Sequence, residues 1–226
     1  KKMLKFLVSL ERLLFITSCF SGFFYAVDID NTSLTQTFED YKKDAITVED
    51  VIAKFDKVSQ VFTSSDNIKT LIKYYAKEGF YDSQFNIKYF MYEYEFELMK
   101  RSKTGINKLD MEEYFSKDNN TIEHIYPKNA RDTYWTNLFS TYSPAHKKII
   151  RNSLGNLVAV SGQKNDKLGN SSFKMKIDNG NNFGFKYGSY SEIELTQYTD
   201  WSIKEIKKRG IMLVDFLQKR WGIKIS

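Results

Sequence analysis

The 226-residue sequence is poor in cysteine, proline and histidine, and each shortage excludes a class of protein or site. A single cysteine, Cys19, permits neither an intramolecular disulfide nor a cysteine-based zinc site. Two prolines and eleven glycines exclude a collagen-like or proline-rich linker protein. A metal ion would therefore have to be held mainly by oxygen ligands and by the two histidines.

What the sequence does contain is typical of a folded, basic protein. An apolar fraction of 42% excludes disorder as the main state, and the length suits one large domain or two small ones. Lysine and arginine number 34 against 28 aspartates and glutamates, which gives a net charge of +6. This excess favours a polyanionic partner only weakly, since many basic proteins bind none.

Residues 1–27 combine a basic start with a hydrophobic run, as a signal peptide does. Glu11 and Arg12 interrupt that run, and no apolar stretch reaches the ~18 residues of a membrane span. We therefore expect a cytoplasmic protein without a membrane segment. Since the sequence starts at Lys1 and not at an initiator methionine, we also expect a fragment of a longer protein. The first helix is predicted to be mostly buried, with apolar positions at Leu4, Leu7, Val8, Leu14 and Phe15.

Residues 1–104 predict a series of helices whose aromatic stripes we interpret as core. The clearest start is Thr47, which is followed by Asp50 in a capping-box spacing. The next helix is predicted to have Ser65 as its cap and Gly79 at its end.

The stretch 87–98 fits two patterns. Its apolar residues follow a helical period, whereas part of it, 92–98, alternates like a strand. The helix is preferred because the wider window fits the 3.6-residue period.

The pattern changes after Gly105, where short β-like runs occur at 121–125 and 157–160. The same part predicts helices near 134–139, after Ser143 and from about 200 to 221, with a loop at 178–190. The expected fold is α+β and mostly helical. We expect a helical scaffold region at 1–104 and a second domain at 105–226.

The residues that could carry chemistry surround His124, at the end of the first β-like run. Glu123 precedes it, and because neighbours on a strand point to opposite faces, the two could serve one site only if the strand ends or bends there. Pro127 indicates that it does. Asn156 opens the second β-like run, and Asn165 falls in the first turn of a short helix that follows. The sequence therefore predicts a ββα unit with one histidine and several oxygen ligands.

These motifs, Glu-His-Ile-Tyr-Pro at 123–127, Leu-Gly-Asn-Leu at 154–157 and Lys-Asn at 164–165, resemble the HNH (His-Me finger, ββα-metal) nuclease motif. With the closing helix, the chain resembles the C-terminal nuclease domain of GmrSD-type modification-dependent restriction endonucleases. The resemblance covers roughly 105–226, and the first helix also looks like the helical linker of these proteins. It implies a Mg²⁺- or Mn²⁺-dependent DNA endonuclease, the effector of a larger restriction or phage-defence protein. Its implied partners are DNA and a nucleotide-dependent N-terminal sensor domain. Because one site per chain cuts one strand, double-strand cleavage would need two events or a second copy of the chain, which leaves a homodimer open.

Residue by residue, the resemblance implies that His124 is the general base and that Asn156 holds the His124 loop through its side-chain amide. It implies Glu123 and Asn165 as metal ligands, with Asn170 as a second candidate on the helix side. Many HNH members have aspartate in place of Glu123 and histidine in place of Asn165, which leaves the metal preference open. The other histidine, His146, is interpreted as a solvated helix residue.

Five lysines crowd the same unit and are either solvated or contacts to the nucleic-acid backbone: Lys128, Lys164, Lys167, Lys174 and Lys176. Two other functions stay open. One is a nucleic-acid-binding module with an inactive nuclease fold, and the other is a helical protein-interaction domain formed by residues 1–104.

Overall fold

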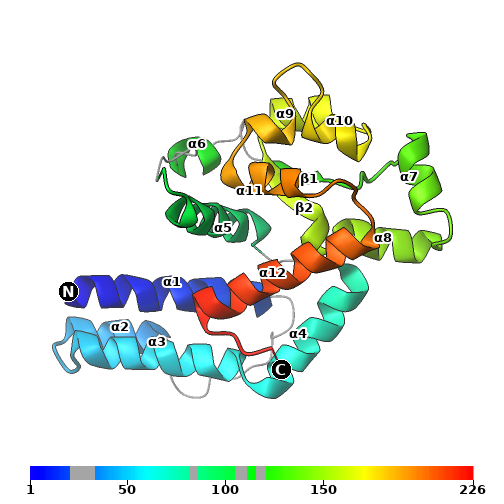
Figure 1. Ribbon diagram of the computed structural model, residues 1–226. Coiled ribbons are helices and arrows are strands. Elements are labelled where there is room, and N and C mark those ends of the chain that lie inside the picture. Colours follow the sequence, from blue (N-terminus) through cyan, green and yellow to red (C-terminus); the bar gives the residue numbers. More distant parts are fainter. Residues whose placement is uncertain (21–33, 82–85, 105–110, 116–120, 226) are drawn as a thin grey trace. The chain divides into compact units, whose positions relative to one another are not determined.

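The computed structural model describes residues 1–20, 34–81, 86–104, 111–115 and 121–225 (Figure 1). Its contacts group the chain into two compact units. One comprises Lys1–Tyr74, Gln84–Asn86 and Gln218–Ser226, and the other comprises Tyr75–Ser83 and Ile87–Leu217. The boundary predicted at 104/105 lies inside the second unit. The fold is mainly helical with one small sheet, as the sequence predicts.

The first unit is built from α1 (Lys2–Phe20), α2 (Leu34–Lys42), α3 (Val48–Phe62) and most of α4 (Ser65–Glu78). Helix α3 begins where the capping pair predicts, because the Asp50 backbone N–H donates to Thr47 Oγ1 and the Thr47 N–H donates to the Asp50 carboxylate. Helix α4 begins at Ser65 itself, so Ser65 is the first helical residue and not the cap. Helices α1 and α3 pack together, with the ring centroids of Phe6 and Phe55 5.7 Å apart.

The prediction of a mostly buried α1 is wrong for one of its faces. That face is more than half exposed at Leu4, Leu7, Val8 and Leu14. The helix instead buries Leu13, Phe15, Ile16 and Cys19. Phe15 stacks on the ring of Trp221 with centroids 3.7 Å apart, and Arg12 Nε donates to the Trp221 carbonyl. No helix in the described part of the chain is long and apolar enough to cross a membrane.

The second unit holds the sheet and a set of mostly short helices. These are α5 (Ile87–Arg101), α6 (Met111–Phe115), β1 (Thr121–His124), α7 (Thr133–Leu138), α8 (Pro144–Asn152), β2 (Leu157–Val160), α9 (Gly162–Leu168), α10 (Phe173–Ile177), α11 (Tyr190–Ile193) and α12 (Ile203–Trp221, in this unit to Leu217). Single 3₁₀ turns lie at Leu154–Asn156, Phe185–Tyr187 and Glu194–Gln197. Segment 87–101 is a helix, which confirms the helical interpretation over the strand.

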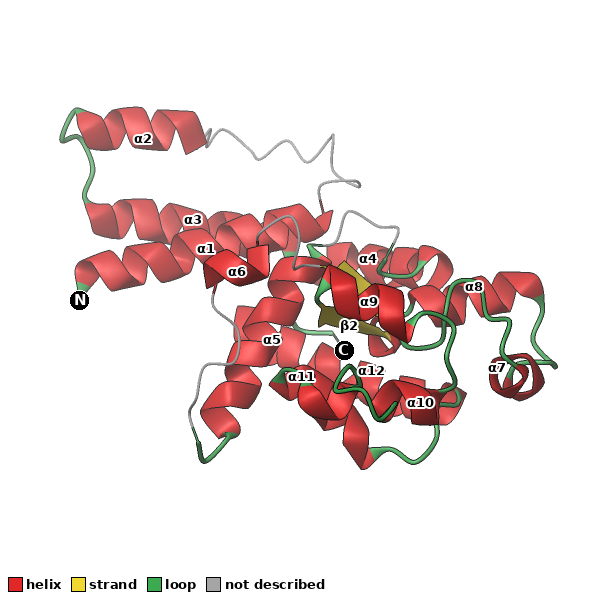
Figure 2. Cartoon of the chain, turned by 90° about the horizontal axis from the view of Figure 1, so that it is seen from above, coloured by secondary structure: helices red, strands yellow, loops and turns green. Residues whose placement is uncertain are grey.

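The two strands pair in antiparallel register, with Thr121 opposite Val160 and His124 opposite Leu157. All four residues of β2 are buried, which accounts for its unbroken apolar sequence. Figure 2 shows the strands in yellow with α9 beside them. An aromatic core lies beneath this arrangement, made largely of Tyr126, Trp135, Phe139, Phe173, Phe185 and Trp201.

Local sequence signals place most of the other elements. Ser143 caps α8 and Pro144 is its first residue, as predicted. The long C-terminal helix begins at Ile203, three residues later than expected, where the Ser202 N–H donates to Glu205. Segment 178–190 is largely irregular, as predicted, except for the short turn near its end.

Candidate functional site

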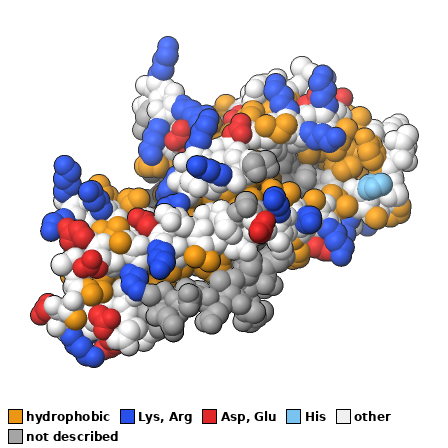
Figure 3. All heavy atoms as spheres, turned by 90° about the horizontal axis from the view of Figure 1, so that it is seen from below, with side chains coloured by type: hydrophobic (Ala, Val, Ile, Leu, Met, Phe, Trp, Pro, Cys, Tyr) orange, Lys and Arg blue, Asp and Glu red, His pale blue; other side chains and the backbone are white. Residues whose placement is uncertain are grey.

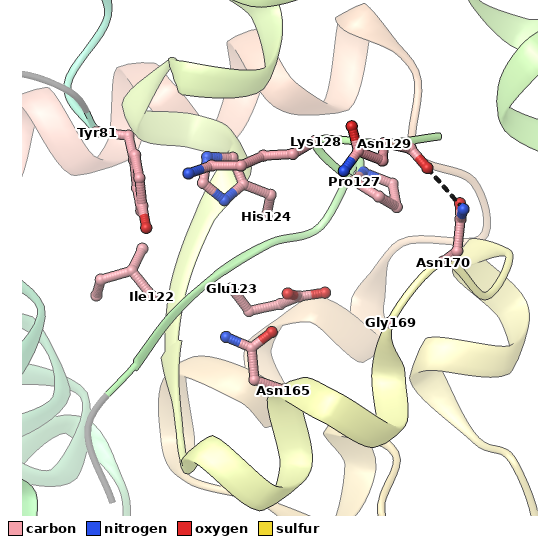
Figure 4. A pocket seen from close by; sticks show the side chains of 10 residues that line it. All are labelled: Tyr81, Ile122, Glu123, His124, Pro127, Lys128, Asn129, Asn165, Gly169 and Asn170. Carbon is pink, nitrogen blue, oxygen red and sulfur yellow. Dashed lines mark hydrogen bonds between the residues drawn. The ribbon is translucent and has the colours of Figure 1, made fainter. Parts of the chain in front are cut away.

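A cavity of about 290 Å³ opens at the carboxyl end of β1 in the second unit (Figure 4). It brings together three residues that the sequence singles out, Glu123, His124 and Asn165. Lys128 and Asn170 also line it, and so does Tyr81, which the sequence analysis missed.

The end of β1 is what allows adjacent residues to share the cavity. The strand ends at His124, and the next backbone N–H, of Ile125, donates to the Asn156 carbonyl at 3.0 Å. In Figure 4 the side chains of Glu123 and His124 leave the chain in different directions, yet both line the cavity. The strand end expected from the sequence is therefore present.

The His124 ring is buried and oriented by two neighbours. Its Nε2 lies 3.3 Å from Oδ1 of Asn152, the last residue of α8. An amide oxygen can only accept, so this contact favours the tautomer with the proton on Nε2. The ring also meets Tyr81 edge-on, with centroids 4.3 Å apart.

Gly79 lets the chain that carries Tyr81 pack closely against Asn152. Its φ of +78° is in the left-handed region, and an added Cβ would lie 2.5 Å from Cβ of Asn152. The backbone N–H of Phe80 donates to the Asn152 carbonyl at 2.7 Å. The chain leaving α4 is thus fastened to the end of α8, which keeps Tyr81 against His124.

The side-chain amide of Asn156 fixes the loop after His124, with the hydrogen bonds that the sequence analysis expects. Oδ1 accepts from the Tyr126 N–H at 2.8 Å and from Trp201 Nε1 at 3.0 Å. Nδ2 donates to the carbonyls of Tyr126 and Arg151, at 3.0 and 2.9 Å. Asn156 is completely buried, and three of the four bonds are buried with it, whereas the bond to Arg151 is part-buried.

Helix α12 braces the same turn from behind. Nη1 of the fully buried Arg209 donates to the carbonyls of Gly155 and Leu157, at 2.9 and 2.7 Å, on either side of Asn156. A Cβ on Gly155 would lie 2.0 Å from the Ile206 carbonyl, so only glycine allows α12 to approach this closely. The sequence analysis did not identify Arg209.

The carboxylate of Glu123 forms a buried ion pair with Lys176, whose Nζ also donates to the His124 carbonyl at 3.2 Å. Burial raises the pKa of Glu123, and the Lys176 ammonium opposes the rise. Lys176 is completely buried, which corrects its assignment as a contact to a nucleic-acid backbone.

The two asparagine candidates differ in position. Asn165 points toward Glu123 in Figure 4, and its Nδ2 donates to Thr121 Oγ1 at 2.8 Å. Asn170 accepts from the Arg131 N–H and donates to the Asn129 carbonyl. Because both ends of its amide brace that loop, Asn170 does not suit the metal-ligand role held open for it. Glu123 and Asn165 are the residues that could hold a metal.

The other four lysines that the sequence analysis considers as contacts to the nucleic-acid backbone fall into two groups. Lys164 is mostly buried and ion-paired with Glu192, so it too does not suit a backbone contact. Lys128, Lys167 and Lys174 are exposed. Lys128 Nζ lies 3.7 Å from the centroid of the Tyr81 ring, at the cavity wall. The lysine and arginine side chains in Figure 3 are scattered over the face shown, so surface charge alone does not single out an interface there.

His146 is exposed on α8, with Nδ1 3.2 Å from Oγ of the capping residue Ser143. It is a solvated helix residue, as predicted. Within the described ranges, no cluster of three or more histidine, cysteine, aspartate or glutamate side chains is arranged to hold a metal ion.

Two antiparallel strands, a helix after the second strand, and a histidine at the end of the first define a ββα unit with a polar cavity at its edge. A family model described as GmrSD restriction endonucleases, C-terminal domain, matches residues 65–216. The chain belongs to this family, and therefore to a class of nucleases. The match begins well before residue 105 and so includes α4, Gly79 and Tyr81. No curated protein and no solved structure matches the chain.

Proposed function

We propose that the second unit is a divalent-metal-dependent HNH (His-Me finger) endonuclease that hydrolyses DNA phosphodiester bonds. In this proposal the chain is the effector of a larger restriction or phage-defence protein, whose nucleotide-dependent sensor domain controls it. The shared cavity of Glu123, His124 and Asn165 is the observation that carries the proposal. Membership of a restriction-endonuclease family supports the nuclease part of the proposal.

His124 is the proposed general base. A water oxygen attacks phosphorus while its proton passes to Nδ1 of His124, and the bond from phosphorus to the leaving oxygen breaks. The leaving oxygen takes its proton from solvent. The hydrogen bond from Nε2 to Asn152 keeps Nδ1 turned toward the water and holds the imidazolium that forms.

The donor atoms at the cavity fit Mg²⁺ or Mn²⁺ with modest affinity. Carboxylate and amide oxygens are the ligands these ions prefer, and Glu123 and Asn165 supply one of each. The Lys176 ammonium already neutralises the Glu123 charge, so water and substrate phosphate would have to complete the ligand set. When bound, the cation would offset negative charge on the scissile phosphate and the leaving oxygen.

The buried ion pair also favours a second candidate function. Because the Lys176 side chain already pairs with Glu123, the same geometry would suit a nucleic-acid-binding module that has no metal and no turnover. Cleavage of DNA separates the two functions directly.

The test is nicking of supercoiled plasmid by the full chain in Mg²⁺, with EDTA as the metal-free arm. The substitution His124→Ala should lower the rate by about 10²–10⁴-fold, the usual contribution of a general base. His146→Ala is the matched control, because it removes the other, exposed histidine and should leave the rate unchanged. If the His124→Ala variant keeps its circular dichroism spectrum and cleaves at the wild-type rate, His124 is not the general base.

One catalytic histidine per chain cuts one strand per event. If the larger protein makes double-strand breaks, two chains or two successive events are needed, and a homodimer on DNA is the arrangement we propose. Linear product that appears at a rate quadratic in protein concentration would support the dimer, whereas nicked circles that persist at every concentration would oppose it.

A further inference from the structure

A second cavity, of about 330 Å³, lies beside the first in the same unit. Its wall includes four cationic side chains, those of Lys128, Arg131, Lys147 and Arg151, together with the ring of Tyr126. Only Lys128 among these was identified from the sequence. Lys147 and Arg151 come from α8, and the other two from the loop after β1.

Positive charge predominates among the described residues that line this cavity. No aspartate or glutamate is among the described residues that line it, and within the described chain none of its four cations makes an ion pair. Like charges gathered around one concave site raise its potential, which favours an anion there.

Two hydrogen bonds to backbone carbonyls hold Arg151 in place. Arg151 donates from Nη1 to the Lys128 carbonyl and from Nε to the Lys147 carbonyl, at 3.1 Å for the second bond. Arg151 thereby ties the loop after β1 to α8 and fixes where the Lys128 backbone lies. Lys147 is half-buried and its side chain lines the cavity.

The two cavities share a wall. Lys128 and Asn129 line both, and Figure 4 shows the two residues at the edge of the His124 cavity. A nucleic-acid strand whose scissile phosphate lies at His124 can therefore run past this second, basic cavity. Phosphate contacts of this kind position a strand without reading its sequence.

We propose that this basic cavity binds a non-scissile phosphate of the substrate strand, adjacent to the phosphate that is cut. The proposal rests on the nuclease function proposed above for the neighbouring site. Arg131 and Lys147 supply the charge, Lys128 bridges the two phosphates, and Arg151 positions both elements of the wall.

The test measures binding of a fluorescent DNA duplex to the full chain in EDTA, by anisotropy at several salt concentrations. Each phosphate contact contributes about −0.9 to the slope of log K against log salt. Lys147→Gln should make the slope shallower by about one such contact, and Lys147→Arg should restore it. Lys148→Gln is the matched control, because it removes the same charge one residue further along α8, at an exposed side chain outside the cavity.

Equal slopes for Lys147→Gln and Lys148→Gln would overturn the proposal.

Inorganic phosphate is the second probe, added at constant ionic strength without DNA. If it stabilises the wild-type protein against heat but not Lys147→Gln, while the DNA slope stays unchanged, the cavity binds free phosphate and the proposal is wrong. These measurements need no cleavage, so failure of this proposal can be told apart from failure of the proposed nuclease function. A chain that never nicks DNA would refute the nuclease function, but its salt dependence of DNA binding could still be measured.

Discussion

The side-chain amide of Asn156 allows a quantitative test of how the site is held together. Asn156→Ala removes four hydrogen bonds, of which three are buried: two to the Tyr126 backbone and one from Trp201, with a part-buried fourth to the Arg151 carbonyl. A buried hydrogen bond contributes roughly 1 kcal/mol net, and a partner left unsatisfied costs more. The substitution should therefore lower the free energy of unfolding by about 4 kcal/mol, a large part of the roughly 5–15 kcal/mol of a typical domain.

Urea unfolding measures this loss. Two of the three tryptophans, Trp135 and Trp201, belong to the second unit and Trp221 to the first, so fluorescence reports mainly on the second unit, with circular dichroism as the second probe. Asn137→Ala is the control, since that side chain is exposed on α7 and should change the free energy of unfolding by less than about 0.5 kcal/mol. A loss below about 1 kcal/mol for Asn156→Ala would refute the reasoning, because the loop after β1 would then be held by other contacts.

Three further outcomes are expected. Glu123→Ala and Asn165→Ala should each raise the Mg²⁺ concentration needed for half-maximal nicking more than they change DNA affinity, with partial rescue by Mn²⁺; an unchanged requirement in both would remove them as ligands. Lys176→Met should destabilise the fold by about 3–5 kcal/mol, because it leaves the Glu123 carboxylate buried without its cation, and adding Glu123→Gln should recover much of that loss in urea unfolding. Burial raises the pKa of the Cys19 thiol, so iodoacetamide at pH 8 should label it only after denaturation, and rapid labelling of the folded protein would contradict its burial.

The local parts of the fold could be predicted from the sequence because their causes are local. Thr47 with Asp50, and Ser143 before a proline, identify helix starts through bonds spanning three or four residues. The end of β1 next to His124 follows in the same way from Pro127.

The parts that were missed depend on tertiary contacts between distant residues. Asn152 lies 28 residues from His124, and Lys176 lies 53 residues from Glu123. A lysine in a basic stretch has the same sequence context whether it is solvated or buried against a carboxylate. The burial of Lys176 therefore could not be inferred from its neighbours.

Helix α1 shows a different limit. It carries apolar residues on two faces, so periodicity alone does not say which face is buried. The structure buries the face with Leu13 and Ile16 and exposes the one with Leu4 and Leu7.

The bracing of the Asn156 turn by Arg209 and Trp201 has a consequence during protein synthesis. Glu123, His124 and Asn165 leave the ribosome well before Arg209, so a nascent or prematurely terminated chain has the chemical groups of the site without the residues that fix their geometry. The candidate site can be completed only when α12 has been made and has folded back onto the turn. Incomplete translation products would then lack a site with the geometry that the proposed function needs.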